Sequence, residues 1–237
     1  MALATKALAR IWGSAKETVQ LYYANVTSWS SKAKNYLLTR PAHLLMAVEH
    51  HQVGEGANTA QDELQMGGWH INWQDATITP EGGTQGGVFI GYRKNLNAFD
   101  ACKQQTPRWT ANLLRLNGGT LLLAVVYLYP GQTATSPQNR QVLAELAGLI
   151  QSLSIPYLLV GDWNLEPEQL KESQFTRRIK GHVAATGAAT INTGAELDYV
   201  IHSMCLVGLV AVQRDFSVPF KPHYIRVPRP TQNLASF

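Results

Sequence analysis

The stretch Tyr157-Leu158-Leu159-Val160-Gly161-Asp162-Trp163-Asn164 runs from four apolar residues into a glycine and two polar side chains. A short apolar run bounded by turn-forming residues predicts a buried β-strand. Asp162 and Asn164 then stand at its carboxyl end, and residues two apart on an extended segment point the same way, with Trp163 turned into the core. The same residues also form ordinary turns. A catalytic interpretation and a turn interpretation both remain open on this stretch alone.

Similar apolar runs recur along the chain, bounded by Gly, Pro or Asn. They predict strands over residues 21–26, 43–48, 87–92, 113–116, 121–127, 157–160, 197–201 and 206–212. Helices are expected over residues 30–39, 137–152 and 166–179. Residues 117–120, Asn-Gly-Gly-Thr, favour a hairpin because Asn and Gly tolerate positive φ. Hairpins mixed with helical crossovers indicate an α+β layered sandwich.

The composition is typical of a globular protein, with 237 residues of which 45% are hydrophobic and 15% charged. We expect a helical N-terminal extension over residues 1–20 and a single domain over residues 21–237. The longest apolar stretch, residues 121–129, is far shorter than the roughly 20 residues of a membrane span. Cys102 and Cys205 lack a zinc-type spacing and are expected to be buried in a reducing, intracellular compartment, nuclear or cytoplasmic. The net charge of +4 permits a polyanionic partner without demanding one.

Polar residues also stand at the ends of other apolar runs. Asn25 follows the first run, Glu49 closes the run over residues 44–48, Asp198 precedes a later run, and His223 lies near the end of the chain. Glu is seldom buried without a partner, so Glu49 beside a buried strand favours a functional role over that of an exposed loop acid. For Asp198, a strand-initiating turn is an equally good interpretation.

The order of these features resembles the endonuclease/exonuclease/phosphatase superfamily, which includes apurinic endonucleases, pancreatic deoxyribonuclease, the endonuclease domains of non-LTR retrotransposons and inositol polyphosphate phosphatases. The matching motifs are Asn25, Glu49, Gly86-Gly87-Val88-Phe89-Ile90, Tyr127 before Tyr129-Pro130-Gly131, Gly161-Asp162-Trp163-Asn164, Leu197-Asp198-Tyr199-Val200 and His223. The resemblance covers nearly the whole chain. It implies a four-layer α/β/β/α sandwich with two mixed, mostly antiparallel sheets.

The resemblance also implies a metal-dependent phosphodiesterase, in which water attacks phosphorus in line. Glu49 would hold Mg²⁺, with Mn²⁺ as an alternative, because a hard cation prefers carboxylate oxygen. Asn25 would ligate the metal or bond to Asp162. The carboxylate of Asp162 would orient or deprotonate the attacking water, and the amide of Asn164 would donate to the oxyanion.

Three further residues receive roles from the same resemblance. His223 would stabilise the charged transition state from the other side, and Asp198 would orient that histidine. Tyr127 would bond the phosphate, although Tyr129 is also close enough in sequence to supply this contact. Because adjacent strand residues face opposite ways, at most one of His50 and His51 would line the cleft.

Two departures from the family pattern affect these expectations. Lys221-Pro222-His223 stands where the family has Ser-Asp-His, so one metal-binding carboxylate is missing, and Val48 replaces a Gln before Glu49. We expect weaker metal binding as a result. The leading hypothesis is an endonuclease acting on nucleic acid, with DNA as the expected substrate, in a monomer or in part of a longer polyprotein. The alternatives are a phosphatase for inositol or lipid phosphates and a degenerate member that binds without cleaving.

Overall fold

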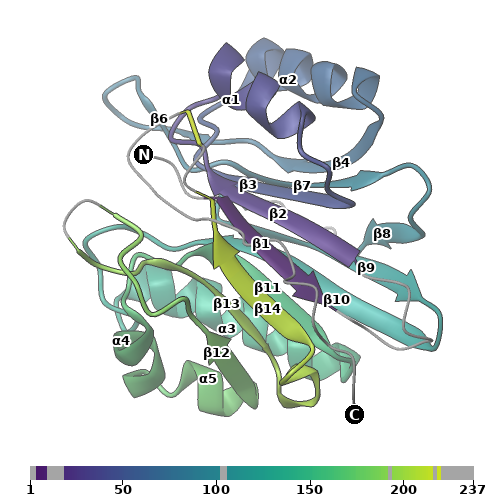
Figure 1. The fold of residues 1–237 in the computed structure, drawn as a ribbon. Coiled ribbons are helices and arrows are strands. Elements are labelled where there is room, and N and C mark those ends of the chain that lie inside the picture. Colours follow the sequence, from purple (N-terminus) through teal and green to yellow (C-terminus); the bar gives the residue numbers. More distant parts are fainter. Residues whose placement is uncertain (1–3, 10–18, 102–105, 192–193, 216–217, 220–237) are drawn as a thin grey trace.

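A computed structural model describes residues 4–9, 19–101, 106–191, 194–215 and 218–219 of the chain. Two six-stranded sheets make up most of it. Helices α1 (Ser31–Leu38) and α2 (Gly54–Met66) lie on the outer side of one sheet, whereas α3 (Pro137–Leu153), α4 (Pro167–Glu172) and α5 (Phe175–Arg178) lie on the outer side of the other (Figure 1). Among the described residues, no helix is long and apolar enough to cross a membrane.

The first sheet contains five strands from the early part of the chain and β14 from the late part. Its strand order is β14 (Val210–Arg214), β1 (Ala4–Ala9), β2 (Val19–Asn25), β3 (Leu44–Val48), β7 (Val88–Arg93) and β4 (Trp69–Gln74). Only the β2–β3 pair is parallel, and α1 makes the crossover between these two strands. A small separate hairpin, β5 (Thr77–Ile78) and β6 (Thr84–Gln85), joins β4 to β7.

The second sheet follows the same plan. Its order is β12 (Gly181–Ala184), β13 (Asp198–Ser203), β11 (Tyr157–Asp162), β10 (Gly119–Tyr127), β9 (Trp109–Leu116) and β8 (Ala98–Asp100). The single parallel pair, β10–β11, is connected through α3. A short 3₁₀ turn, η1 (Met204–Leu206), leads from β13 toward β14.

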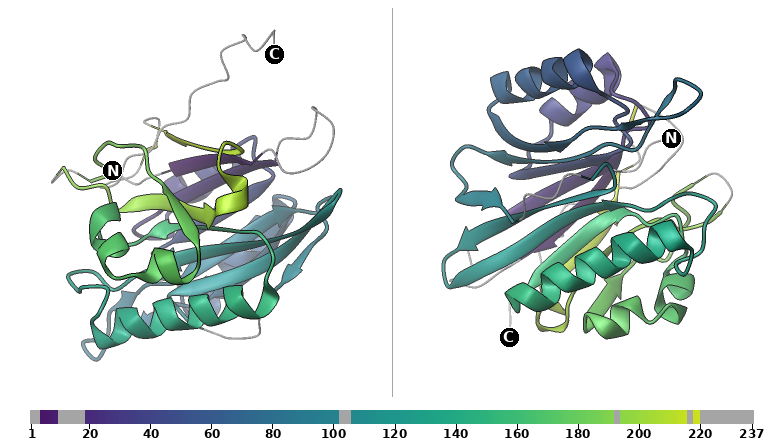
Figure 2. Two further views of the ribbon diagram at one scale, coloured as in Figure 1. Left: turned by 90° about the horizontal axis from the view of Figure 1, so that it is seen from below. Right: turned by 180° about the vertical axis from the view of Figure 1, so that it is seen from behind.

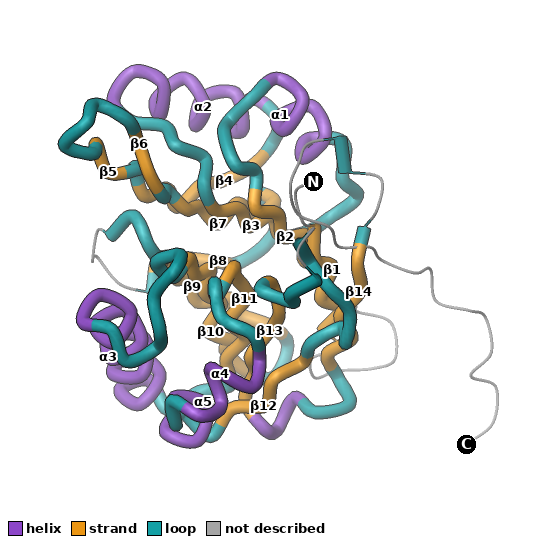
Figure 3. The backbone as a smooth tube through the Cα atoms, turned by 90° about the vertical axis from the view of Figure 1, so that its left-hand side faces the viewer, coloured by secondary structure: helices purple, strands orange, loops and turns teal. Residues whose placement is uncertain are grey.

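Three apolar clusters hold these layers together. One lies between the two sheets and contains Met46, Val125 and Val160. Another joins the first sheet to α1 and α2, and a third joins the second sheet to α3, α4 and α5. Each fully buried aliphatic side chain contributes about 1.5–3 kcal/mol. The resulting helix, sheet, sheet, helix layering, visible in Figures 2 and 3, confirms the predicted α+β sandwich with two mixed, mostly antiparallel sheets.

Most of the periodic segments form the elements that they predict. In α3, Val142, Leu146 and Ile150 are buried against the second sheet, as their helical spacing requires. The β9–β10 hairpin turns at Gly118, whose φ of +104° is accessible to glycine but strained for other residues. Each apolar run therefore marks a sheet or helix face that faces a core.

Local propensity fails in three places. Ala4–Ala9 forms strand β1, so the helical extension predicted for residues 1–20 is wrong there; pairing with both β2 and β14 outweighs a weak helical pattern. The helix predicted over residues 166–179 is split into α4 and α5, because Gln174 adopts a left-handed φ of +64°. Strand β14 begins at Val210 rather than at residue 206.

Two other features of the structure differ from the predictions. Cys205 is exposed, not buried, because it lies in the short η1 turn at the surface, and Cys102 lies outside the described residues. Helix α2 and strand β4 were not predicted. The α2 segment contains two glycines and many polar residues, and only Ala57, Ala60 and Leu64 are buried.

Candidate active site

Three of the expected site residues form one row across the second sheet. Asp162 of β11 pairs with Tyr127 of β10 on one side and with Asp198 of β13 on the other. Side chains alternate along a strand, so these three face the same way as Val125, Val160 and Val200, which belong to the core between the sheets. The row therefore points toward the first sheet.

The first sheet brings two residues to the same edge. Asn25 is the last residue of β2 and pairs with Val48, the last residue of β3. Glu49 follows Val48 directly and adopts a left-handed φ of +60°. A non-glycine residue in this region costs about 1–3 kcal/mol and persists where the surroundings hold it, which is common at functional sites.

The side chain of Asn25 joins the two sheets. Its amide nitrogen donates to Glu49 Oε2 at 2.7 Å and to Asp162 Oδ2 at 2.9 Å. Its oxygen accepts from the backbone N–H of Thr27 at 2.9 Å, which fixes the orientation of the amide. The predicted bond between Asn25 and Asp162 is present, and one amide holds two carboxylates close together.

Tyr127 adds a second connection to Glu49. Its buried hydroxyl donates to Glu49 Oε1. Burial, reinforced by the nearby Glu49 carboxylate, raises the pKa of Tyr127 well above its ordinary value of 10.0. The phenol therefore stays protonated and acts as a donor at neutral pH.

Asn164 occupies a turn rather than an extended segment. Its φ is +49°, its backbone N–H donates to Asp162 Oδ1 at 3.0 Å, and its side-chain amide donates to the carbonyl of Leu128 at 2.9 Å. The expected extended geometry from Asp162 to Asn164 is therefore wrong. The turn nevertheless places Asn164 beside Asp162 and leaves its amide with a second hydrogen to donate.

Trp163 lies between these two residues and faces away from them. It is fully buried, stacks on Tyr199 with ring centroids 5.7 Å apart, and donates from Nε1 to the Tyr199 carbonyl. The prediction that this side chain enters the core is confirmed. Its burial supports the loop that carries Asp162 and Asn164.

Asp198 is fully buried in the same region. It accepts a hydrogen bond from the Tyr23 hydroxyl at 2.9 Å, and burial together with the Asp198 charge raises the pKa of Tyr23 well above 10.0. Its expected partner His223 lies outside the described residues, as do Lys221 and Pro222. The orienting role of Asp198 therefore stays a prediction.

The two histidines after Glu49 have different surroundings. His50 is buried and stacks on Trp73 with ring centroids 3.8 Å apart, and its ring bonds to the backbone of Gln52 and Gln74. Burial lowers the pKa of His50 to about 3, so this ring is a neutral packing group. His51 instead has Nε2 at 3.9 Å from Glu49 Oε1.

Arg108 is a site residue that sequence reasoning missed. It is 2% exposed, and its guanidinium lies 3.7 Å from the centre of the Tyr129 ring and 4.9 Å from that of Tyr127. Nη2 donates to Gln85, whereas Nε and Nη1 have no hydrogen-bond partner among the described residues. The available signal was a charged residue directly before strand β9. The sequence predicted this strand only from residue 113, so Arg108 was not recognised as a residue at the end of a strand.

The carboxylates at this edge suit a hard divalent cation. Mg²⁺ is commonly held by one or two carboxylates and keeps several waters. Glu49 is 18% exposed and lies close to Asp162 through their shared amide, so its carboxylate can reach both a metal and solvent. In the described part of the chain, no group of three or more His, Cys, Asp or Glu side chains forms a complete metal cage. Metal ligation by Glu49 or Asn25 stays a prediction.

Comparison with known families and structures agrees with the fold. The sequence pattern of the Endonuclease/Exonuclease/phosphatase family matches residues 22–217. No curated protein matches the chain closely enough in sequence to be reported.

Solved structures share the fold at low sequence identity. The endonuclease domain of TRAS1, a telomere-specific non-LTR retrotransposon, is 12% identical with a TM-score of 0.66, covering 87% of this chain and 95% of that domain. The AP endonuclease LMAP from Leishmania major is 11% identical with a TM-score of 0.64, covering 87% and 86%. The 3′ phosphatase NExo from Neisseria, bound to product DNA hairpin, is 15% identical with a TM-score of 0.58, covering 86% and 95%.

Proposed function

The chain belongs to the endonuclease/exonuclease/phosphatase family, and from this premise we propose that it is a Mg²⁺-dependent phosphodiesterase that cleaves nucleic acid, with DNA as its substrate. Members of the family are hydrolases that act as nucleases or phosphatases. Similarity to a retrotransposon endonuclease domain and to an AP endonuclease supports an endonuclease.

The observation that carries the proposal is the Asn25 amide shared by Glu49 and Asp162. Two carboxylates so close together repel each other, and the repulsion is stronger in a partly buried site than in water. A divalent cation relieves that repulsion. The site is therefore suited to bring a cation and an anionic substrate together.

In the proposed mechanism, Glu49 would hold the metal, and the Asn25 amide keeps the carboxylates of Glu49 and Asp162 in fixed positions. A bound Mg²⁺ supplies charge neutralisation at the phosphate and a lower pKa for water. Asp162 accepts bonds from Asn25 and from the Asn164 backbone, which hold its carboxylate fixed while it orients or deprotonates the attacking water.

Charge on the phosphate is then stabilised by donors from several elements. The remaining amide hydrogen of Asn164 and the ring of His223 would bond the developing oxyanion, with Asp198 orienting His223. Tyr127 and Arg108 stand on the β10 and β9 side of the same edge. The guanidinium of Arg108 is buried, and its Nε and Nη1 have no partner among the described residues, so it adds a positive charge at this edge that attracts an anionic phosphate.

Nicking of supercoiled plasmid tests the proposal. The purified chain should nick DNA with Mg²⁺, should lose this activity with EDTA, and should recover it with Mg²⁺ or Mn²⁺. Asp162→Ala and His223→Ala should abolish nicking, whereas Asp62→Ala, at an exposed position of α2 on the outer side of the first sheet, should retain it. Equal nicking by wild type and Asp162→Ala would show that the activity belongs to a contaminant or another site.

The same purified protein can be used to test two alternative functions. Similarity to the Neisseria 3′ phosphatase favours testing a 3′-phosphorylated oligonucleotide and inositol phosphates alongside plasmid. Release of phosphate without nicking would assign a phosphatase. Pro222 stands where the family has Asp, which suggests a second alternative: a protein that binds its ligand without cleaving it. In that case calorimetry should detect no heat of Mg²⁺ binding, and only the Pro222→Asp variant should cleave.

A further inference from the structure

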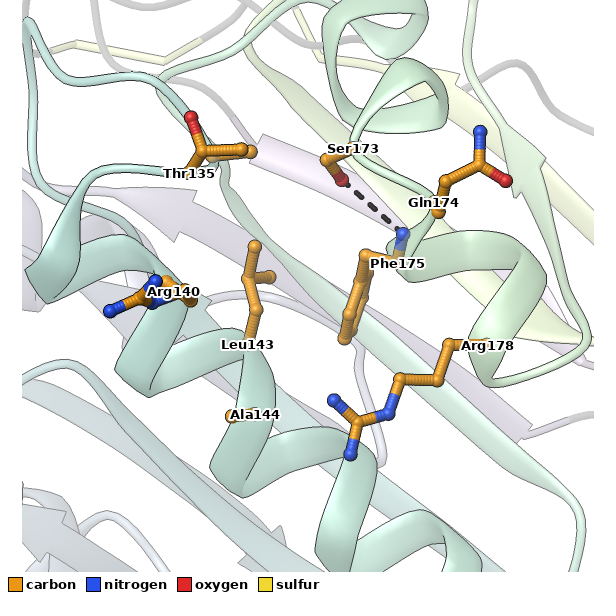
Figure 4. A pocket seen from close by; sticks show the side chains of 9 residues that line it. Thr135, Arg140, Leu143, Ala144, Ser173, Gln174, Phe175 and Arg178 are labelled. Carbon is orange, nitrogen blue, oxygen red and sulfur yellow. Dashed lines mark hydrogen bonds between the residues drawn. The ribbon is translucent and has the colours of Figure 1, made fainter.

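A pocket opens on the outer helical layer, between α3 and the turn that joins α4 to α5. Its volume is about 230 Å³. Leu143 and Ala144 of α3 and Phe175 of α5 form its apolar floor, whereas Arg140 and Arg178 stand on opposite sides of the opening (Figure 4). None of the residues that line the pocket belongs to the candidate active site.

The floor of the pocket is a fixed part of the fold. Gln174 adopts a φ of +64°, which ends α4 and starts α5 in a new direction. The Ser173 hydroxyl accepts from the backbone N–H of Phe175 at 3.3 Å across this break. Phe175 is buried and lies 6.2 Å from Trp163, measured between ring centroids. The pocket is therefore preformed and needs no rearrangement to accept a ligand.

The rim carries an uncompensated positive charge. No lining residue is acidic, and neither Arg140 nor Arg178 forms an ion pair within the described ranges. Arg140 also lies in the first turn of α3, where the helix presents its positive dipole end and where Ser136 provides no side-chain cap. Both guanidinium groups are exposed and can receive carboxylates in paired hydrogen bonds.

Size and lining together select the kind of ligand. Sites for cofactors and drug-sized molecules usually measure about 300–1,000 Å³, so this pocket is too small for a nucleotide or a cofactor. It is large enough for one bulky apolar side chain. A nucleic-acid backbone would contact the arginines but would leave the apolar floor exposed to water, which is unfavourable.

We propose that this pocket binds a short segment of a partner protein in which a bulky apolar side chain, such as Phe or Leu, is flanked by Asp or Glu. The apolar side chain packs on Leu143, Ala144 and Phe175, and the flanking carboxylates bond Arg140 and Arg178. This docking site is separate from the proposed phosphodiesterase site, so either one stands without the other.

Fluorescence anisotropy with the full chain tests the proposal. The probe is a fluorescein-labelled peptide with the sequence Gly-Asp-Asp-Phe-Asp-Asp-Gly, compared with one in which Asn replaces Asp and one in which Gly replaces Phe. We expect saturable binding of the first peptide and at least about tenfold weaker binding of the other two. Absence of binding at millimolar protein, or equal binding of all three peptides, would overturn the proposal.

Four variants test whether the peptide binds in this pocket. Arg140→Glu and Arg178→Glu should each weaken peptide binding by about tenfold or more, and Ala144→Trp should block it by filling the pocket. Ala144 is exposed on the helix, so this change leaves the core intact. Arg177→Glu is the matched control, because it makes the same charge change on α5 at a residue that does not line the pocket. If Arg177→Glu weakened peptide binding equally, the effect of the other charge changes would come from net charge and not from the pocket.

A labelled 20-base-pair DNA duplex supplies the contrasting measurement. Its affinity should be the same for wild type and Ala144→Trp, since the proposed ligand is a peptide. If Ala144→Trp and Arg178→Glu weaken DNA binding while Arg177→Glu does not, the pocket is a nucleic-acid surface and the proposal fails. Circular dichroism and melting temperature should match wild type in all four variants.

Discussion

The hydroxyl of Tyr127, on the second sheet, donates a hydrogen bond to the carboxylate of Glu49, which follows the first sheet. The bond ties the two halves of the sandwich at the edge where the candidate site lies. It also commits one oxygen of the expected metal ligand to a protonated donor, whose pKa is raised by burial and by Glu49 itself.

We expect Tyr127→Phe to reduce DNA nicking by about 10- to 100-fold, because Glu49 loses the hydrogen-bond donor that orients its carboxylate. The free energy of unfolding should fall by only about 1 kcal/mol, since the ring remains packed. Steady-state nicking and urea denaturation measure the two effects. Tyr129→Phe is the matched control and should keep more activity than Tyr127→Phe; the reverse order would assign the phosphate contact to Tyr129.

Asn25→Asp should make the fold depend on a divalent cation. The change replaces a donor to Glu49 and Asp162 with a third carboxylate, so repulsion should lower the free energy of unfolding by about 1–3 kcal/mol in EDTA. Mg²⁺ should then raise the melting temperature of the variant more than that of wild type, by preferential binding to the folded state. Thermal melting with and without Mg²⁺ measures both.

Asn35→Asp provides the comparison for this experiment. Asn35 is exposed on α1, on the outer side of the first sheet, and its change adds the same charge. If Mg²⁺ stabilises Asn35→Asp as much as Asn25→Asp, the cation acts through general screening and the metal site is misplaced.

The sequence predicted the elements that a local pattern specifies. The run over residues 157–160 packs alternately on two apolar cores, so all four of its residues are apolar, and Gly, Asp and Asn follow it. Its strand and the turn after it could therefore be predicted from residue types. Asp162 and Asn164 indeed form a turn, through the Asn164 N–H bond to Asp162, and Asp162 shares the Asn25 amide with Glu49. The turn and catalytic interpretations of this segment are therefore compatible, because the turn is what positions the carboxylate.

Features that depend on contacts between distant segments could not be predicted. Asn25 bridges two carboxylates only because β2 and β11 end at one edge of the closed sandwich. Arg108 is buried by the rings of Tyr127 and Tyr129, which lie about twenty residues later in the chain. Likewise, β1 is a strand because β2 and β14 offer ladder bonds, a gain that no short window of sequence reveals.

Gly161→Ala should damage the site through the backbone. A Cβ at Gly161 would lie 2.0 Å from the carbonyl oxygen of Val126, and a backbone group cannot move aside as a flexible side chain can. We expect the free energy of unfolding to fall by about 1–3 kcal/mol and nicking to be lost, since Asp162 is the next residue. Gly148→Ala should instead stabilise the protein by about 0.5–1 kcal/mol, because this α3 glycine has open space around it. Equal urea midpoints for the two variants would contradict the close approach of β10 and β11.

His202 should make stability depend on pH. It is 2% exposed, and burial, with a smaller contribution from neighbouring His182, lowers its pKa from 6.5 in the folded protein. The unfolded chain therefore binds this proton more readily, so stability is retained above about pH 6.5 and declines as the pH falls toward the folded pKa. His202→Asn should flatten the decrease in melting temperature between pH 7 and pH 5. His182→Asn should retain most of it, because burial is the main cause; an unchanged slope in His202→Asn would refute the assignment.

Arg108→Met should separate catalysis from stability. The side chain is buried with two unpaired donors, so its charge is costly to the folded protein unless an anion is present. Replacing it with an apolar chain of similar length should leave the free energy of unfolding unchanged or raise it, despite the lost bond to Gln85. The kcat/KM for nicking should fall by about 100-fold, because the site loses a buried positive charge that attracts the phosphate. Arg115→Met, at an exposed arginine on β9, should keep wild-type activity. A stable, fully active Arg108→Met would mean that the buried guanidinium does not act on the phosphate.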